Sequence, residues 1–577
     1  IRAEEGVFWN SASVRIVRFF SAGSCGPSSA FVRYTAPMAL TKLAGGTVYD
    51  PANGVHGEVR DLWADGGKIV APPADPATLP ARTFDLSGLV VMPGGVDMHA
   101  HIAGPKVNVA RKLRPEDRRN SPPFRRTPLL RSGTLGSTPT TFATGYLYAG
   151  LGYTSVFDAA IPPLGARHTH EEFHDTPVID KGFFVLVGNN HYVMDQLGRG
   201  EFDRVRAFCG WLLHATRGYA LKVVNPGGVE VWKQGGSGLA HLDDEVPGFG
   251  VTPRGIVGAV ARTADELKLP HPAHIHCNQL GMPGNWTTTL DTMRAVDGSR
   301  GHFTHIQFHS YGGKGPDSQE TFRSEVPALA EYVNAHPELT VDVGQVLFGE
   351  TTSMTGDGPL GYYLHKVTGR KWFNGDTECE GGCGIVPIEY KEKSFVHALQ
   401  WAIGLEWYLL VQDPWRVAMS TDHPNGGSFL AYPEICALLM SRDYRREVVK
   451  RLPEKLRAVC TLPDLEREYT LSEIAIVTRA GPARMLGLTH KGHLGIGADA
   501  DVTVYTPGDD RRAMFELPRY VFKAGELIVE EGEIRAVPFG PSLAVRPRYD
   551  EGAVPHIREW FEGAYSLSFD NYAVGPE

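Results

Sequence analysis

The chain has 577 residues, of which 42% are hydrophobic and 21% charged, and its formal net charge is −9. This length is enough for one large domain and a smaller second one, and the composition is that of a globular protein. The mild negative charge gives no indication of a nucleic-acid partner. No apolar run approaches the roughly 20 residues that a membrane-spanning helix needs, so we expect no membrane partner either.

Cysteine usage bears on compartment and cofactor. The seven cysteines are scattered, Cys379 and Cys383 are four residues apart, and no C-x-x-C motif occurs. This spacing argues against an iron–sulfur cluster and against a disulfide framework. We therefore expect a cytoplasmic protein with free thiols.

The two ends of the chain differ from its middle. Residues 1–37 show no clear amphipathic period, and we expect a disordered N-terminal extension. In residues 38–90, turn signals such as Gly45-Gly46 separate short β-rich segments. Short β-rich segments separated by turn signals occur again in residues 491–545, and a C-terminal tail follows at 546–577. The two β-rich ends predict one small β-sandwich domain that both ends of the chain build together.

Between residues 91 and 490, short apolar runs typical of buried strands alternate with helical stretches. Eight strands interleaved with helices are what a (β/α)8 barrel of the TIM type requires, so the predicted fold class is α/β. The predicted strands are 90–96, 154–158, 183–187, 220–224, 273–276, 303–307, 340–343 and 417–420. The predicted helices include 256–267, 326–335, 394–411 and 472–486.

The first barrel strand is followed by His99-Ala100-His101. Because side chains alternate along a strand, the two imidazoles point to the same side. Two neutral imidazoles on one side are half of a zinc site. On its own the pair also fits two ordinary loop histidines, so its meaning depends on what the other strand ends carry.

Working residues of a barrel lie at the C-terminal ends of its strands. Lys222 lies inside an apolar run, where a charged amine is costly unless it is paired or neutralised. A neutral amine can take up carbon dioxide and become a carbamate, an anionic ligand able to bridge two metals. The alternative is a lysine that pairs with an acid or extends out of the barrel.

Three further strand ends complete an ordered series. The fifth strand offers His274 and His276, the sixth offers His305 and His309, and Asp422 follows the last strand at a Gly/Pro loop. The series H-x-H, Lys, His, His, Asp supplies enough ligands for two zinc ions about 3.5–4 Å apart. The choice within each histidine pair depends on the register of the strand and stays open here.

A long insertion after the first strand, residues 106–131, is rich in arginine, proline and serine. It is either a solvated loop or an anion-binding segment, because arginine suits carboxylate and phosphate groups. The candidate substrate-binding arginines are Arg118, Arg119, Arg125 and Arg126.

Over residues 40–540 the chain resembles the metal-dependent amidohydrolase superfamily. Beside the ligand series, residues 478–488 and 491–502 look like that superfamily's closing helix and its return to the β domain. Within the superfamily, several stretches resemble the A subunit of formylmethanofuran dehydrogenase and, equally, the A subunit of the formyltransferase/hydrolase complex of methylotrophic bacteria. These stretches are 95–108, 222–228, 305–313 and 420–427.

The resemblance implies a dinuclear zinc centre that interconverts N-formylmethanofuran and formate plus methanofuran, the one-carbon carrier, during formaldehyde oxidation or carbon dioxide reduction. It implies partner subunits of the same complex, which would hold any redox centres. Under this interpretation we expect Asp422 to move the proton, and Asn225, His309 and the arginine insertion are the candidate substrate contacts, because the tail of the family's carrier is rich in glutamate. The metal ligands carried over are His99, His101, carboxylated Lys222, His276, His305 and Asp422.

Two other functions fit part of this pattern. A hydantoinase or dihydroorotase acting on a cyclic amide would use a nearly identical metal site, and only the substrate pocket separates it from a formamide hydrolase. A scaffold subunit that has lost catalysis would share the fold, but the complete ligand series argues against it. His423, next to Asp422, has no assigned role.

Overall fold

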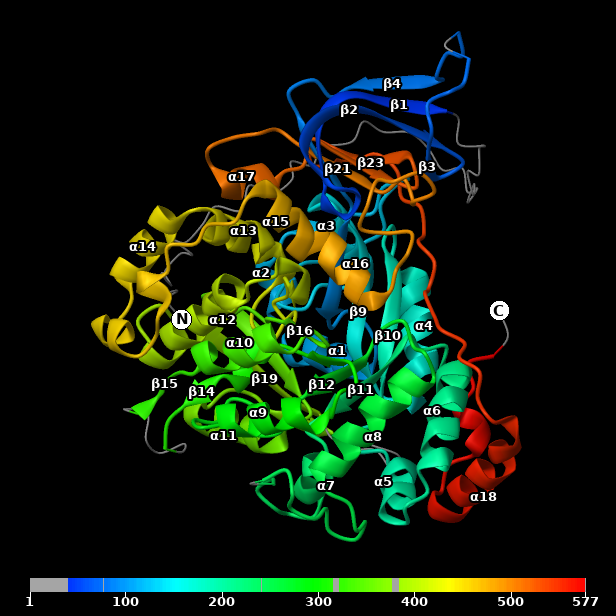
Figure 1. The fold of residues 1–577 in the computed structure, drawn as a ribbon, viewed down its shortest axis with the longest axis vertical. Helices are drawn as coiled ribbons and strands as arrows, with labels where there is room; N and C mark the ends of the chain where they lie inside the picture. Colours follow the sequence, from blue (N-terminus) through cyan, green and yellow to red (C-terminus); the bar gives the residue numbers. More distant parts are fainter. Residues whose placement is uncertain (1–39, 76, 240, 315–320, 376–382, 576–577) are drawn as a thin grey trace, which may run out of the picture.

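A barrel of eight parallel strands forms the centre of the computed structural model, which describes residues 40–75, 77–239, 241–314, 321–375 and 383–575 (Figure 1). Strands that follow one another in the chain are neighbours in the sheet. A parallel bridge between Ala100 and His423 joins the two ends of the sheet. The barrel strands are β6 (Gly95–Ala100), β9 (Tyr153–Ile161), β10 (Asp180–Leu186), β11 (Ala220–Val224), β12 (Ala273–His276), β13 (Gly301–Phe303), β16 (Leu339–Asp342) and β20 (Val417–Ala418).

The predicted α/β barrel is therefore confirmed, with two changes at its strands. The first predicted strand, 90–96, is in fact two: β5 (Val90–Pro93) belongs to the small β domain, and the barrel strand begins at Gly95. The chain changes sheets here because the Gly94 N–H donates to Asp501 of the small domain. A Cβ atom at Gly94 would lie 2.4 Å from Thr154 Oγ1, so the crossing leaves room only for glycine.

The sixth predicted strand, 303–307, lies too far along the chain. The strand is Gly301–Phe303, and a short 3₁₀ turn follows at Ile306–His309. His305 has φ 35° and ψ 47°, a left-handed conformation that breaks the alternation of the strand. Sequence periodicity does not register such a turn, because His305 is not a residue type that marks it.

Helices cover the barrel, and the four predicted helices are present. The 472–486 prediction is one continuous helical segment, although Ile476–Ala480 within it is π-helical. The other long helices are α3 (Thr141–Gly150), α4 (Ala166–Asp175), α5 (His191–Gly198), α6 (Phe202–Thr216), α8 (Pro253–Glu266), α9 (Trp286–Ala295), α10 (Val326–Ala335), α12 (Phe395–Leu410), α13 (Tyr432–Met440) and α14 (Arg442–Arg451). The helical segments at 472–486 are α15 (Leu471–Ala475), the π-helical turn and α16 (Gly481–Leu486).

The predicted small β domain lies above the barrel and is built from two parts of the chain, residues 41–93 and 502–534 (Figure 1). Its strands are hydrogen-bonded into one nine-stranded sheet with an apolar core of its own. Strand β5 joins the two halves, because it pairs with β1 on one side and with β21 on the other. The strands are β1 (Thr41–Asp50), β2 (Val55–Asp65), β3 (Lys68–Val70), β4 (Arg82–Asp85), β5, β21 (Val502–Tyr505), β22 (Tyr520–Lys523), β23 (Glu526–Glu530) and β24 (Glu533–Ile534).

A buried ion cluster ties the small domain to the barrel. Lys523 Nζ lies 2.7 Å from Asp180 of β10 and 2.8 Å from Asp501. Lys491 also contacts Asp180 and Asp501. Two ammonium groups therefore neutralise these buried carboxylates, and the cluster links β10 to the small domain.

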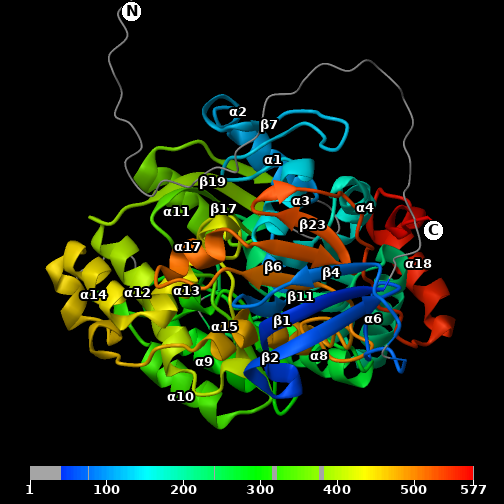
Figure 2. The ribbon, with the colours of Figure 1, turned by 90° about the horizontal axis from the view of Figure 1, so that it is seen from above.

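A second small sheet covers the mouth of the barrel, and we call it the lid sheet. The periodicity of the sequence did not predict it. It consists of β17 (Gly349–Thr355), β19 (Cys383–Tyr390) and β18 (Phe373–Gly375), and α11 (Gly358–Thr368) packs on it. Helix α1 (Pro105–Leu113) of the arginine-rich insertion also contacts β17 and β19. Figure 2 shows α1 and α2 (Asp117–Asn120) on the same side of the molecule as this lid sheet.

The last part of the chain packs along the barrel. Leu543 N–H donates to Lys181 of β10, and Val545 N–H donates to Gly218 just before β11. Helix α18 (Val554–Ala564) then packs against α5 and α6 (Figure 1). Residues 1–37 and Cys379 lie outside the described residues, so the predictions made for them stay predictions.

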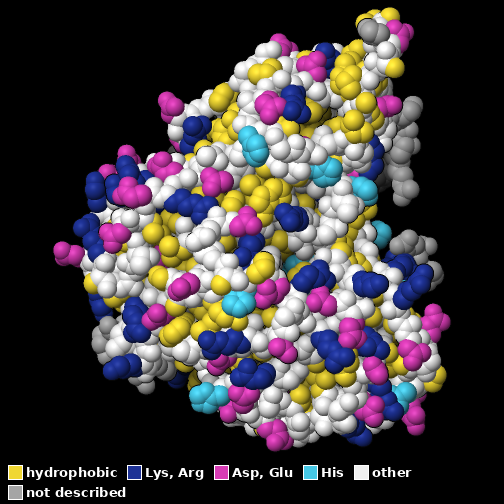
Figure 3. Space-filling view, viewed as in Figure 1, with side chains coloured by type: hydrophobic (Ala, Val, Ile, Leu, Met, Phe, Trp, Pro, Cys, Tyr) yellow, Lys and Arg dark blue, Asp and Glu magenta, His cyan; other side chains and the backbone are white. Residues whose placement is uncertain are grey.

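The surface seen in Figure 3 carries basic and acidic side chains interspersed over the barrel helices and the small domain. In the described part of the chain, no helix combines the length and the apolar character needed to cross a bilayer.

Candidate metal centre

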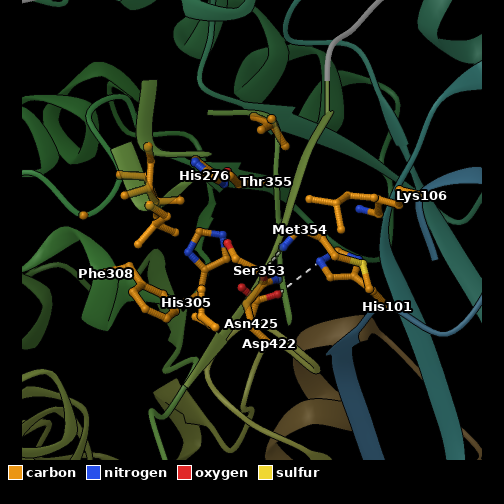
Figure 4. A pocket seen from close by; sticks show the side chains of 18 of the residues that line it. His101, Lys106, His276, His305, Phe308, Ser353, Met354, Thr355, Asp422 and Asn425 are labelled. Carbon is orange, nitrogen blue, oxygen red and sulfur yellow. Dashed lines mark hydrogen bonds and ion pairs between the residues drawn. The ribbon is translucent and has the colours of Figure 1, made fainter. Parts of the chain in front are cut away.

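A cavity of about 550 Å³ opens where the barrel strands end. The six predicted ligands all line it, and none of them is more than 4% exposed. His101 and Lys106 lie on one side of the cavity, His276 and His305 on the other, and Asp422 lies between them (Figure 4). The lid sheet and α11 contribute the outer wall, so the polar groups sit at the inner end of a largely apolar cavity.

The H-x-H pair meets Asp422. His99 Nε2 lies 2.9 Å and His101 Nε2 3.1 Å from Asp422 Oδ1. The opposite ring nitrogens face carboxylates, since His99 Nδ1 is 3.1 Å from Asp342 and His101 Nδ1 is 3.4 Å from Asp158. A carboxylate behind each ring favours a proton on Nδ1 and leaves Nε2 free to bind a cation, as metal-binding histidines are usually arranged.

The structure separates the members of each competing histidine pair. His276 and His305 line the cavity, with their ring centres 4.5 Å apart, whereas His274 and His309 do not line it. His274 lies one layer deeper in the barrel and hydrogen-bonds to other histidines. His276 Nε2 and His305 Nδ1 have no hydrogen-bond partner among the described residues.

His309 lies beside these two residues although it is outside the cavity. Its ring centre is 5.1 Å from that of His276 and 5.3 Å from that of His305. Neither of its ring nitrogens has a hydrogen-bond partner in the described part of the chain. A nitrogen from each of His276, His305 and His309 falls within one 4.8 Å group, so geometry alone leaves His309 able to join the cation site.

Lys222 and Lys106 are the two lysines among the described lining residues of the cavity. The side chain of Lys222 is fully buried, and its Nζ has no hydrogen-bond partner among the described residues. Burial lowers the pKa of this amine to about 7, although Asp342 and Asp422 act in the opposite direction. The amine is therefore neutral in a large fraction of molecules at neutral pH, the state that reacts with carbon dioxide.

The site carboxylates remain ionised despite their burial. Burial by itself raises the pKa of Asp422, but the neighbouring His99, His305 and His101 outweigh it and hold the pKa well below its usual range. The pKa of Asp342 is also well below its usual range. Burial raises this pKa, but the neighbouring His99 and His302 lower it by more. Burial lowers the pKa of His305 to about 3, so this imidazole is neutral and able to bind a cation.

Three residues with positive φ shape the site. Asp422 has φ 50° and His305 φ 35°, and both follow a barrel strand within four residues and line the cavity. A Cβ atom at Gly344, which has φ 68°, would lie 2.4 Å from the His305 Cβ. Such strained backbone positions tend to gather at functional sites.

Sequence reasoning did not single out the carboxylates behind the histidines. Asp342 ends β16, and Asp158 lies within the last residues of β9. Both satisfy the strand-end criterion that found Asp422, so the signal was present. A further buried carboxylate, that of Asp97, accepts hydrogen bonds from Tyr148 at 2.8 Å and Tyr432 at 2.6 Å. It thereby anchors the strand that carries the H-x-H pair.

The predicted substrate-binding residues lie outside the cavity. Arg118, Arg119, Arg125 and Arg126 are exposed on the insertion, and none of them lines it. Asn225 shapes the loop after β11, where its side-chain oxygen accepts a hydrogen bond from Asn278 at 2.9 Å. The polar residues that do line the cavity, and that sequence reasoning missed, include Lys106, Asn189 and Asn425.

The donor set fits two divalent cations. Buried and without hydrogen-bond partners among the described residues are His276 Nε2, His305 Nδ1 and Lys222 Nζ, while His99 Nε2 and Asp422 Oδ1 contact one another at 2.9 Å. Orphaned buried polar atoms are costly, and a group of them that converges is typical of a site completed by a bound ion. Imidazole ligands suit zinc as well as copper, iron and nickel ions.

A barrel with candidate metal ligands at its strand ends, joined to a small β domain, is the architecture of an amidohydrolase. The model of the amidohydrolase family matches residues 82–529, and the chain belongs to this family.

Two curated relatives show the group within the family. The protein FwdA of Methanocaldococcus jannaschii is 44% identical over 93% of this chain and 96% of its own length. The A subunit of the formyltransferase/hydrolase complex Fhc of Methylorubrum extorquens is 39% identical over 93% of this chain and 96% of its own length. The chain is therefore a member of the group that contains FwdA and the Fhc A subunit.

The solved structures agree. The formyltransferase/hydrolase complex of Methylorubrum extorquens, solved with methylofuran, contains a chain that matches with a TM-score of 0.87 and 38% identity over 93% of this chain and 96% of that one. A D-aminoacylase matches with a TM-score of 0.51 and 14% identity over 88% of this chain and 99% of that one, which shows the shared fold alone.

Proposed function

We propose that this protein is the hydrolytic subunit of a formyltransferase/hydrolase or formylmethanofuran dehydrogenase complex. It would interconvert a formylated furan amine carrier, such as N-formylmethanofuran, and formate plus the free amine. The observation that carries the proposal is the convergence of six strand-end donors on one cavity in a chain 39–44% identical to FwdA and the Fhc A subunit.

The metal ligands proposed are the six predicted residues. His99, His101 and Asp422 would hold one zinc ion, and His276 and His305 the second, with the modified Lys222 between them. Two bound zinc ions would supply a hydroxide nucleophile at neutral pH and would polarise the formyl oxygen. The remaining steps fall to the side chains of this chain.

Lys222 would act as a carbamate. Its neutral amine adds to carbon dioxide, a new N–C bond forms, and one proton is released, which leaves an anionic group with two ligand oxygens. The buried position supports this modification, because an unmodified ammonium there would have neither water nor a hydrogen-bonding partner among the described residues.

Asp422 would carry the proton. Its Oδ1 faces the cavity at the inner end, where it can accept the proton of the attacking water and then donate it to the leaving amine nitrogen. The lowered pKa of Asp422 supports the first half of this role, since the carboxylate is ionised before the reaction begins.

The choice of a formylated carrier over a cyclic amide rests on the relatives. A D-hydantoinase of Streptomyces coelicolor is 24% identical over 81% of this chain, far below FwdA and its Fhc counterpart. A zinc count per chain, together with assays on the N-formyl carrier and on a hydantoin, tests the proposal. Two zinc ions with turnover of the formamide alone would support it, and preferential turnover of the hydantoin would contradict it.

Lys106 offers a positive charge to an anionic product. It lies at the start of α1, lines the cavity beside His101 and has no ion-pair partner among the described residues (Figure 4). We expect Lys106→Met to raise the inhibition constant of formate about tenfold to a hundredfold, since a charge-assisted hydrogen bond contributes about 1.5–3 kcal/mol. The measurement is product inhibition by formate at steady state.

Lys112→Met serves as the control for this test, because Lys112 is an exposed lysine on the same helix. An inhibition constant that stays unchanged in Lys106→Met would show that formate binds elsewhere.

The exposed arginines remain a proposed binding segment for a carboxylate-rich carrier tail, outside the cavity itself. We expect the combined variant Arg118→Glu, Arg119→Glu, Arg125→Glu and Arg126→Glu to raise KM about tenfold, as four exposed pairs contribute about 0.2–1 kcal/mol each. The increase of KM with ionic strength in the unmodified protein should also weaken.

Reversal of four exposed arginines outside the insertion, Arg82→Glu, Arg199→Glu, Arg262→Glu and Arg457→Glu, controls for the same change in net charge. Equal KM values for the insertion variant and the unmodified protein would show that the insertion is a solvated loop without a binding role.

A further inference from the structure

A row of imidazoles leads from the H-x-H pair down the inside of the barrel. His99 Nδ1 lies 3.0 Å from His274 Nε2, and His274 Nδ1 lies 2.9 Å from His271 Nε2. The row ends where His271 Nδ1 lies 2.8 Å from the backbone oxygen of Met485 in α16. It therefore connects the cavity to the closing helix, and the proposed reaction makes no use of His271 or His274.

The row is enclosed on both sides. His271 and His274 are fully buried. The Phe184 ring stacks against His271 with centres 5.2 Å apart and planes at 20°, and the His302 ring stacks against His274 at 4.7 Å and 23°. Flat contacts of this kind hold each imidazole in one orientation, so its two nitrogens keep the same neighbours.

The hydrogen-bond direction along the row follows from its end. A backbone oxygen can only accept a hydrogen bond, so His271 Nδ1 carries a proton. In a neutral ring the other nitrogen, His271 Nε2, then carries a lone pair. This nitrogen must accept a hydrogen bond from His274 Nδ1–H, so His274 Nε2 carries a lone pair in turn. His274 Nε2 then accepts from His99 Nδ1–H. Burial keeps His271 neutral, because it lowers the pKa of this imidazole well below the usual value.

We infer that His271 and His274 are positioning residues that hold the proton of His99 on Nδ1 and so direct the lone pair of its Nε2 into the cavity. The inference rests on the proposed function, because it concerns a ligand of the proposed metal centre. Asp342 acts in the same direction, since its carboxylate lies 3.1 Å from His99 Nδ1 and shares this N–H with His274; Thr304 Oγ1 also contacts this nitrogen. The row adds an uncharged acceptor, His274 Nε2, whose state is fixed at the far end of the row by the carbonyl of Met485, 214 residues after His271.

The test is the zinc affinity of the full-length chain, measured by competition with a chelator. His271→Phe keeps a flat ring next to Phe184 but cannot hydrogen-bond, and it does not touch His99. We expect it to weaken zinc binding about tenfold to a hundredfold, the usual effect of losing an outer hydrogen-bond partner of a ligand. His271→Gln, whose amide can both donate and accept, should keep the affinity within about threefold of the unmodified protein.

His170→Phe is the matched control. His170 is another buried histidine that hydrogen-bonds to a backbone oxygen, that of Thr216 at 3.0 Å, but it lies on α4 and outside the row. If His271→Phe and His170→Phe lower the thermal stability alike and leave the zinc affinity unchanged, the role of the row is only structural and the inference is wrong. If the unmodified protein binds no zinc, the proposed function fails first, and the inference fails with it.

A direct measurement avoids dependence on how the variants fold. Nitrogen-15 NMR of the zinc-loaded protein labelled at histidine distinguishes protonated from bare ring nitrogens, with His271→Gln and the unmodified spectrum compared for assignment. We expect Nδ1–H and a bare Nε2 at both His271 and His274. A proton on Nε2 of His274 would overturn the inference whatever the zinc affinities are.

Discussion

Replacing Asp422 by asparagine is expected to lower formamide hydrolysis about a hundredfold to ten-thousandfold, the usual contribution of a positioned general acid–base group. The amide has nearly the same shape as the carboxylate and keeps an oxygen that can face His99 and His101. It cannot accept the proton of the attacking water. The expected loss is therefore in kcat, measured with the N-formyl carrier, while the zinc content measured by elemental analysis stays close to that of the unmodified protein.

Asp357→Asn provides the control for this loss. Asp357 is also a buried aspartate, but its carboxylate accepts backbone N–H groups of Leu280 and Leu360 at the start of α11 and does not face the histidines. A kcat near that of the unmodified protein is expected for it, with a lower melting temperature. If Asp422→Asn keeps its hydrolytic rate, the proton is carried by another group.

Lys222→Ala should have the second large effect, on the metal itself. Without the proposed carbamate, the two cations lose their shared anionic ligand, and we expect one zinc per chain or none, with hydrolysis lowered by at least about a thousandfold. The scale of this loss reflects the removal of the nucleophile and of the oxyanion stabiliser together. Zinc content and activity are measured on the same preparation, with and without added bicarbonate.

The neighbouring strand offers a matched control for loss of a buried lysine. Lys181 of β10 is also buried, but its Nζ donates to the backbone oxygens of Thr176 and Gly540, each at 2.9 Å, and it does not line the cavity. Lys181→Met should destabilise the fold and keep the full zinc content. Two zinc ions in Lys222→Ala would refute the bridging carbamate.

These two experiments separate the parts of the site. Loss of activity with metal retained assigns chemistry to Asp422, and loss of metal assigns a ligand role to Lys222. His271 and His274 would add a third kind of residue, which touches neither substrate nor metal and acts through the orientation of a ligand.

The sequence alone was enough to predict the candidate ligands and the strand that each of them follows. The H-x-H pair, Lys222, the histidines of the fifth and sixth strands and Asp422 were found because parallel barrel strands end at one face, and all six line one cavity. This worked because strand alternation and strand ends are local properties that a short stretch of residues carries. The β domain built from both ends was found in the same way, from local turn signals and alternation.

Only the tertiary structure decided what depends on depth and on distant neighbours. His274 and His276 lie on the same side of β12, so alternation cannot separate them; their layer in the barrel does, because His276 reaches the cavity and His274 meets His99. The left-handed turn at His305, the lid sheet over the mouth and the exposed position of the arginines are likewise fixed by packing between segments far apart in the chain. Alternation along a strand indicates the face of the sheet on which a side chain lies. Its neighbours across the barrel are determined only when the whole chain has folded.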